Sequence, residues 1–220
     1  MTPEHLPLFP LGTVLFPGMP LPLQIFEERY RRLLRDQAEA ELVFGVVCTA
    51  SGREVGDEPA MYRVGTAASL VNHRVRRDGR ADIIVLGVRR FRVLEEDWSR
   101  GYCVGQIDWL DEQVGNEATA TQARERVALL FGHYVRGVVQ LTDQQFDGVA
   151  LSDDLVEASY DLASRLPLHT WERQSLLECD SASERFSMLE PIVRREVSLL
   201  HKAGAAGLAL NHPGGVFAAN

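Results

Sequence analysis

The chain of 220 residues is long enough to bury a substantial hydrophobic core, either in one large domain or in two smaller lobes. Its formal charge of −8 argues against wholesale binding to nucleic acid, and no apolar run approaches the roughly 20 residues of a membrane-spanning helix. Lys202 is the only lysine among the 23 lysine and arginine residues, and no phosphate-binding G-x-x-x-x-G-K-[ST] motif surrounds it, which argues against ATP-driven activity.

The N-terminus lacks the basic region and apolar run of a signal peptide, so we expect a cytoplasmic protein. The three cysteines, Cys48, Cys103 and Cys179, are far apart and form no C-x-x-C pair, so we expect them to be reduced and mostly buried. The six histidines show no H-x-x-x-H spacing and no carboxylate placed beside them to complete a site. The sequence therefore predicts neither a metal site nor a cofactor.

The opening stretch, residues 6–34, combines two apolar strand-like segments, a proline–glycine corner and the first turns of a helix. In the segment 20–25, P-L-P-L-Q-I, apolar residues alternate with prolines that lack an N–H, so we expect an edge or rim strand of a curved sheet. Residues 16–19, F-P-G-M, suit a type II turn, because proline fixes its own φ and the following glycine supplies a positive φ. The charges of Glu27 and Glu28 favour a helix that starts at this point.

Later strands are predicted in segments that are apolar, rich in β-branched residues and bounded by glycine, proline or polar loops. The pair Asp78-Gly79 predicts a two-residue hairpin turn. Gly87 interrupts a long strand, and we expect it to mark the bulge or bend that closing a small barrel requires. The predicted strands cover residues 42–49, 64–77, 81–95 and 102–110.

After residue 112 the strand pattern stops, and apolar residues recur at helical spacing. Ser152 is a good N-cap, Ser181 begins a capping box, and Pro191 is expected to bend or shorten the last helix. The predicted helices cover about residues 118–139, 152–166, 170–178 and 181–200. The Gly- and Ala-rich segment that follows predicts a flexible tail.

Four blocks of this sequence resemble one family, in the order and at the spacing typical of it. The first is P-L-F-P-L-G-T-V-L-F-P-G-M-P-L-P-L with F-E-E-R-Y-R-R-L-L after it, and the others lie at 64–70, 87–94 and 166–178. Over roughly residues 5–200 the chain is similar to the N-terminal substrate-binding domain of Lon-type ATP-dependent proteases. The resemblance implies an α+β fold, in which a pseudouridine-synthase-and-archaeosine-transglycosylase-like (PUA-like) β-barrel with one helix is followed by a helical bundle.

The expected organisation is a PUA-like β-barrel lobe at 1–115, a helical bundle lobe at 116–203 and a flexible tail at 204–220. Full Lon proteases, as the resemblance implies, continue into an ATPase module and a Ser-Lys protease domain, and neither begins within this sequence. We therefore expect a stand-alone, non-catalytic member of the family. Ser198 precedes Lys202 at helical spacing, but a catalytic dyad requires a desolvated lysine, and this pair lies beside the predicted tail.

The favoured function, which the resemblance implies, is recognition of polypeptide segments, including unfolded ones, in protein quality control or as an adaptor. The corner 13–20 carries more apolar surface than loops normally show. It either folds back as a lid on the barrel core or presents apolar side chains to a partner, with the rim strand adding hydrogen bonds to an extended peptide. The candidate peptide-binding residues are Leu15, Phe16, Met19, Trp98 and Tyr102.

The alternative function is RNA binding by a basic hairpin, because PUA-like barrels include RNA binders and arginine both contacts phosphate and stacks on bases. Net acidity and the absence of aromatic residues in the hairpin argue against this alternative. A solvated hairpin whose arginines pair with Asp and Glu is the other interpretation. The candidate nucleic-acid-binding residues are Arg74, Arg76, Arg77, Arg80, Arg90 and Arg92.

Overall fold

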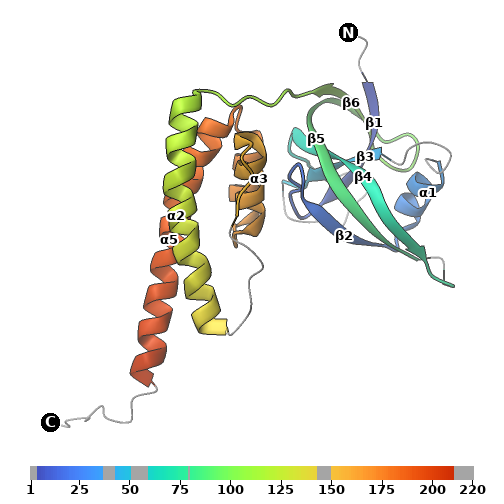
Figure 1. Ribbon diagram of the computed structural model, residues 1–220. Coiled ribbons are helices and arrows are strands. Elements are labelled where there is room, and N and C mark those ends of the chain that lie inside the picture. Colours follow the sequence, from blue (N-terminus) through green and yellow to red (C-terminus); the bar gives the residue numbers. More distant parts are fainter. Residues whose placement is uncertain (1–3, 37–42, 51–58, 79, 143–149, 211–220) are drawn as a thin grey trace. The chain divides into compact units, whose positions relative to one another are not determined.

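The computed structural model describes residues 4–36, 43–50, 59–78, 80–142 and 150–210 (Figure 1). The chain packs as two compact units, Met1–Gln113 with Tyr160–Asp180 and Val114–Ser159 with Ser181–Asn220. The lobe limits expected from the sequence stay a prediction. Packing nevertheless assigns the segment 160–180 to the unit that holds the strands, whereas the sequence places it in the helical lobe.

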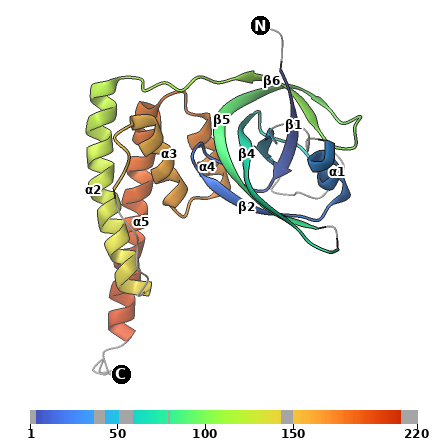
Figure 2. The same cartoon turned by 45° about the vertical axis from the view of Figure 1, so that its right-hand side comes forward.

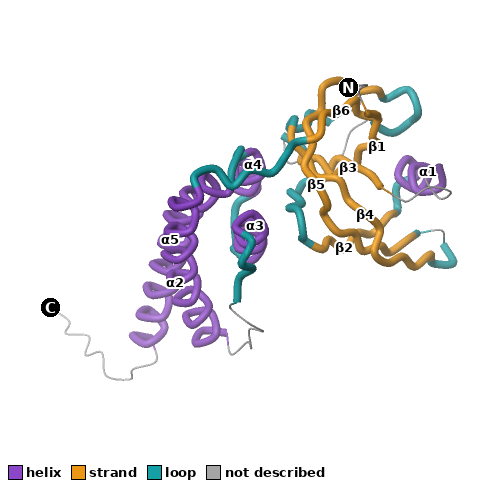
Figure 3. The backbone as a smooth tube through the Cα atoms, turned by 45° about the horizontal axis from the view of Figure 1, so that its top comes forward, coloured by secondary structure: helices purple, strands orange, loops and turns teal. Residues whose placement is uncertain are grey.

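The first unit is built on a sheet that largely closes on itself (Figure 3). Its elements are β1 (Glu4–Leu11), β2 (Pro20–Ile25), α1 (Glu28–Asp36), β3 (Val43–Cys48), β4 (Val64–Val75), β5 (Ala81–Asp97) and β6 (Val104–Trp109). The sheet order is β2-β5-β4-β3-β1-β6, and a further pairing joins β5 to β6. The strands β1, β3, β4, β5 and β6 therefore form a closed ring, in which β1 and β3 are parallel and the other pairs are antiparallel. β2 pairs with the first half of β5 and ends the sheet, as expected of an edge strand.

Alternating apolar side chains fill the interior of this ring, as the strand period requires. The Phe9 ring lies 3.8 Å from that of Tyr30 and 5.7 Å from that of Phe44, measured between ring centroids. Tyr30 and Leu33 form the buried face of α1 and attach this helix to the core. The predicted α+β fold, with a strand-rich barrel and an early helix followed by further helices, is confirmed.

A tight turn connects the first strand to the edge strand β2. Met19 N donates to Phe16 O at 3.1 Å, and Gly18 has a φ of 77°, which confirms the predicted type II turn. Gly18 N donates to Gly87 O at 2.8 Å and Gly87 N donates to Met19 O at 3.0 Å, so two residues of the turn oppose one residue of β5. This is the pattern of a G1 bulge, which needs a glycine at its first position. The pairing of β4 with β5 also shifts register beside Gly87, as predicted.

Gly87→Ala is expected to destabilise the fold, because a Cβ at this position would lie 2.2 Å from the backbone oxygen of Phe16. Backbone must move to relieve this collision, and we expect a loss of about 1–3 kcal/mol in the free energy of unfolding measured in urea. Gly132→Ala is the matched control, because its Cβ would meet only Arg136 Nη1 at 3.9 Å and alanine favours a helix interior. Equal stability of the two variants would contradict the assignment of Gly87 as a close-approach site.

The remaining helices are α2 (Glu117–Thr142), α3 (Leu155–Arg165), α4 (Thr170–Glu178) and α5 (Ala182–Leu210). In the second unit, α2 and α5 lie side by side and run in the same direction (Figures 1 and 2). Arg126 pairs with Glu190 at 3.2 Å near the start of the pair, and Leu200 packs at Gly137 further along. α5 continues through Pro191 to Leu210 and so enters the segment predicted to be a tail. Residues 211–220 lie outside the described residues.

A buried arginine of β5 joins the segment 160–180 to the barrel within the first unit. Arg90 is 2% exposed, and its Nε and Nη2 donate to the two carboxylate oxygens of Glu112 at 2.7 and 3.2 Å. Its Nη1 donates to Leu177 O at 2.7 Å and to Cys179 O at 2.8 Å, which satisfies carbonyls at the end of α4. Tyr160 completes the group by donating its hydroxyl to Glu112. These bonds join residues far apart in sequence, so no local pattern predicts them.

Candidate functional site

The first half of β5 is apolar on both of its faces. Ile83 and Val85 are buried in the core, as alternation requires. Ile84, Leu86 and Val88 point the other way and are 40%, 37% and 57% exposed. Strands with apolar side chains on both faces are typical of sheets that are covered on both sides, so the exposure of this outer face makes it a candidate interaction surface.

The edge strand β2 extends this apolar surface. In the register of the sheet, Pro22 pairs with Ile84 and Pro20 pairs with Leu86, and both prolines are exposed. Leu21 and Leu23 point inward and pack against the core. We name the exposed set the outer-face patch, and its members are Pro20, Pro22, Ile84, Leu86 and Val88.

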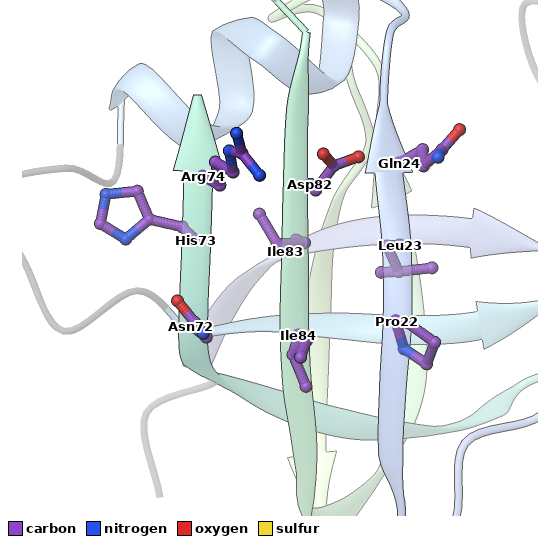
Figure 4. A pocket seen from close by; sticks show the side chains of 9 residues that line it. All are labelled: Pro22, Leu23, Gln24, Asn72, His73, Arg74, Asp82, Ile83 and Ile84. Atoms are coloured by element: carbon purple, nitrogen blue, oxygen red, sulfur yellow. The ribbon is translucent and has the colours of Figure 1, made fainter. Parts of the chain in front are cut away.

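Polar side chains flank the patch at one end. Figure 4 shows Asn72, Ile84 and Pro22 in one row across β4, β5 and β2, with Arg74, Asp82 and Gln24 in another row two residues away along the strands. Together with Leu23, His73 and Ile83 they line a hollow of about 510 Å³. Apolar side chains bordered by hydrogen-bonding groups are the usual composition of a protein-binding surface.

The prolines of β2 decide how an extended peptide can bind. The carbonyl oxygen of Met19 points to β5. Because the direction of the backbone polar groups alternates along a strand, the N–H and C=O groups of Leu21 and Leu23 also point to β5, whereas the backbone carbonyls of Pro20 and Pro22 point to the free edge. A proline has no N–H, so this edge offers carbonyl acceptors without donors at these two positions, which disfavours addition of a strand. The expectation that the rim strand adds backbone hydrogen bonds to a peptide is therefore not favoured, and the outer face of the sheet is the better candidate.

Burial decides between the two alternatives for Phe16 in the corner 13–20. Phe16 is 0% exposed, and its ring lies 5.9 Å from the ring of Tyr160, so its side chain folds back onto the core and is not an exposed contact for a peptide. Leu15 and Tyr102 are also buried, and the Tyr102 hydroxyl donates to Asp36 at 3.0 Å. Burial, followed by this hydrogen bond, raises the pKa of Tyr102 above its ordinary value.

The other two candidate residues are half-buried. Met19 packs against the first core cluster, and Trp98 packs against a second cluster that contains Phe91. The structure therefore does not bring the candidate set together on one exposed surface. A role for Met19 and Trp98 in binding stays a prediction.

The arginines of the predicted nucleic-acid site divide into three groups. Arg90 is buried with Glu112 and is unavailable to a ligand, so its assignment to a binding surface is wrong. Arg76 pairs with Asp82 at 2.7 Å, and Arg80 pairs with Asp78 at 3.5 Å, as expected of a solvated hairpin. The third group is exposed and shows no acidic partner among the described residues; its members are Arg74, Arg77 and Arg92.

The residues considered for chemistry lie in ordinary surroundings. Ser198 and Lys202 are both exposed on the last part of α5, which does not provide the desolvation that a Ser-Lys dyad needs. Within the described ranges, no group of three or more His, Cys, Asp and Glu side chains is placed to hold a metal ion. Cys48 and Cys103 are buried and Cys179 is half-buried, and none of the three is in a disulfide. No helix in the described part of the chain has the length and apolar character to cross a membrane.

Comparison with solved structures places the fold among Lon N-terminal domains. The chain is similar to a Lon N-terminal domain protein from Xanthomonas campestris, with 28% identity and a TM-score of 0.57, covering 84% of this chain and 96% of that one. It also shares its fold with the N-terminal domain of Mycobacterium avium complex Lon protease, with 16% identity and a TM-score of 0.64, covering 87% of this chain and 98% of that one.

The family follows from the sequence match. The family model of the ATP-dependent protease La (LON) substrate-binding domain matches residues 5–195, so the chain belongs to this family. The chain is 23% identical over 209 residues to the Lon proteases of Cytophaga hutchinsonii and of Escherichia coli strain K12. It is covered to 90% and 91% in these matches, but it spans only 25% and 26% of the relatives, about a quarter of their length. The predicted resemblance is thus confirmed.

The sequence contained a signal for the outer-face patch that the predictions did not use. Residues 83–88, I-I-V-L-G-V, are apolar at every position, whereas a strand with one solvated face alternates. The neighbouring prolines of β2 could be assigned to the same face only once the register with β5 was known.

Proposed function

We propose that this chain is a non-catalytic module that binds polypeptide segments and that the outer-face patch contacts them. The observation that carries the proposal is the exposure of Ile84, Leu86 and Val88 on a strand whose opposite face fills the core. Membership in a substrate-binding family supports a polypeptide as the ligand. A role as an adaptor or in protein quality control is the form of this function that we expect.

The physical basis of the proposed binding is burial of apolar area on a rigid sheet. The patch lies on paired strands, so it loses little conformational entropy on binding, and less of the gain of about 25 cal/mol per Å² of buried apolar area is offset by ordering costs. The free edge lacks donors at Pro20 and Pro22, so affinity comes from side chains rather than from backbone hydrogen bonds. Such a surface accepts many sequences that expose apolar residues, as unfolded segments do.

The double variant Ile84→Ser with Leu86→Ser tests the proposal. We expect it to weaken binding of an unfolded model polypeptide, such as reduced and alkylated α-lactalbumin, by about tenfold or more, because two central apolar anchors are lost. Binding is measured by fluorescence anisotropy, and the melting temperature is expected to stay close to that of the wild type.

Leu94→Ser is the matched control, because Leu94 is 41% exposed on the other half of the same strand. We expect it to bind like the wild type. Equal weakening by Leu94→Ser, or no weakening by the double variant, would overturn the assignment.

The measurement is repeated after nuclease treatment, and loss of binding with nuclease would favour the RNA alternative. No cleavage of the polypeptide is expected, with or without ATP.

A further inference from the structure

Arg173 on α4 is a half-buried arginine that makes no ion pair with any carboxylate in the described ranges. Its guanidinium carbon lies 5.1 Å from the centroid of the Phe16 ring, and its Nη2 lies 3.3 Å from the Met19 sulfur. Its Nε is buried and has no hydrogen-bond partner among the described atoms. A thioether is only a weak acceptor, so the guanidinium is poorly satisfied where it lies.

The contrast with Arg90 shows what is absent around Arg173. Arg90 is more buried, and a carboxylate and two carbonyl oxygens accept its hydrogen bonds. Desolvation lowers the pKa of Arg173 from its ordinary value, as burial without an opposite charge does. Burying the Arg173 guanidinium without an acceptor costs desolvation free energy on folding. A negatively charged ligand that accepts its hydrogen bonds would offset this cost.

We propose that Arg173 is a binding site for a carboxylate of the recognised polypeptide. The Met19 sulfur lies where one carboxylate oxygen would accept from Nη2, and the adjacent Nε offers a second, parallel donor. The Met19 side chain is flexible, so it can move away and leave this place to the carboxylate oxygen. The chain leads directly from Met19 to Pro20, so the site adjoins the outer-face patch along the sequence.

This inference rests on the proposed function only for the polypeptide nature of the ligand. The net charge of −8 does not favour acidic ligands at long range, but screening limits such repulsion to about 10 Å at 0.1 M salt. Selection of a carboxylate therefore depends on the local guanidinium. The expected ligands are segments that combine apolar residues with an acidic side chain or a free C-terminus.

Arginine side-chain NMR tests the carboxylate site without any polypeptide. Blocked aspartate, blocked asparagine and N-acetyl-alanine with a free carboxylate are titrated into the full chain. We expect the Arg173 Nε–Hε resonance, assigned with Arg173→Gln, to shift saturably with one or both carboxylates and not with blocked asparagine. The two carboxylates distinguish a side-chain ligand from a C-terminal one. No saturable shift with either carboxylate would overturn the inference.

A peptide series then tests its role in recognition. Amidated apolar peptides carry one aspartate at successive positions, each paired with its asparagine counterpart. We expect the wild type to prefer aspartate by about tenfold at one or more positions. Arg173→Gln is expected to remove this preference, Arg173→Lys to retain part of it, and Arg136→Gln, a control on an exposed arginine of α2, to leave it intact.

The two proposals fail in different ways. Equal affinity for aspartate and asparagine peptides, with binding still weakened by the Ile84 and Leu86 substitutions, would overturn the carboxylate site and leave the proposed function standing. Absence of peptide binding together with a saturable NMR shift would overturn the proposed function and leave the carboxylate site. A preference for aspartate that survives in Arg173→Gln would also overturn the inference.

Discussion

Arg90→Ala is expected to lower the free energy of unfolding by about 3 kcal/mol, because removal of one partner from a buried ion pair leaves the others unsatisfied. Leu177 O and Cys179 O lose their charged donor, and Glu112 loses its ion pair while the hydrogen bond from Tyr160 stays. Glu112 is partly exposed, which places the cost at the lower end of the range for such pairs. For a chain of this size the melting temperature should fall by about 6–12 °C.

Arg92→Ala provides the control for this variant. Arg92 lies two residues further along the same strand and is exposed, so its loss should change stability by no more than about 0.5 kcal/mol. Urea denaturation of both variants gives the comparison. An Arg90→Ala variant as stable as Arg92→Ala would show that the segment 160–180 does not depend on this arginine.

Phe16→Ala is expected to cost about 3–5 kcal/mol, the range for truncation of a fully buried phenylalanine. The ring is enclosed by Tyr160 and Arg173 in the described structure, so its removal leaves a cavity that rigid neighbours fill only in part. This result would establish Phe16 as a core residue rather than an exposed contact for peptides.

Phe26→Ala is the matched control, because Phe26 is 60% exposed just after β2. We expect its free energy of unfolding to stay within about 0.5 kcal/mol of the wild type. If Phe16→Ala were equally mild and weakened peptide binding instead, Phe16 would be a binding contact rather than a core residue.

Local signals explain the part of the fold that was predictable. The turn at 16–19 followed from Pro17 and Gly18, whose backbone preferences act within four residues. The bulge at Gly87 and the edge position of β2 followed from the limits that glycine and proline place on a strand. Each of these features depends on residues that are neighbours in sequence.

Features that depend on long-range packing were missed. The assignment of 160–180 to the barrel unit rests on Arg90 and its partners some ninety positions away, and a basic residue in a strand gives no sign that it is buried. The burial of Phe16 could not be predicted either, because an apolar turn can fold inward or face a partner. The outer-face patch needed the register of β2 against β5 before its members could be recognised as one surface.

Methyl NMR during titration with an unfolded model polypeptide tests the central claim most directly, because it reports on the outer-face patch in the intact chain. We predict that the methyl resonances of Ile84, Leu86 and Val88 shift or broaden saturably, while those of Leu94 and Leu129, exposed elsewhere, remain unchanged. Unchanged resonances at Ile84 and Leu86 in the presence of bound polypeptide would contradict the account.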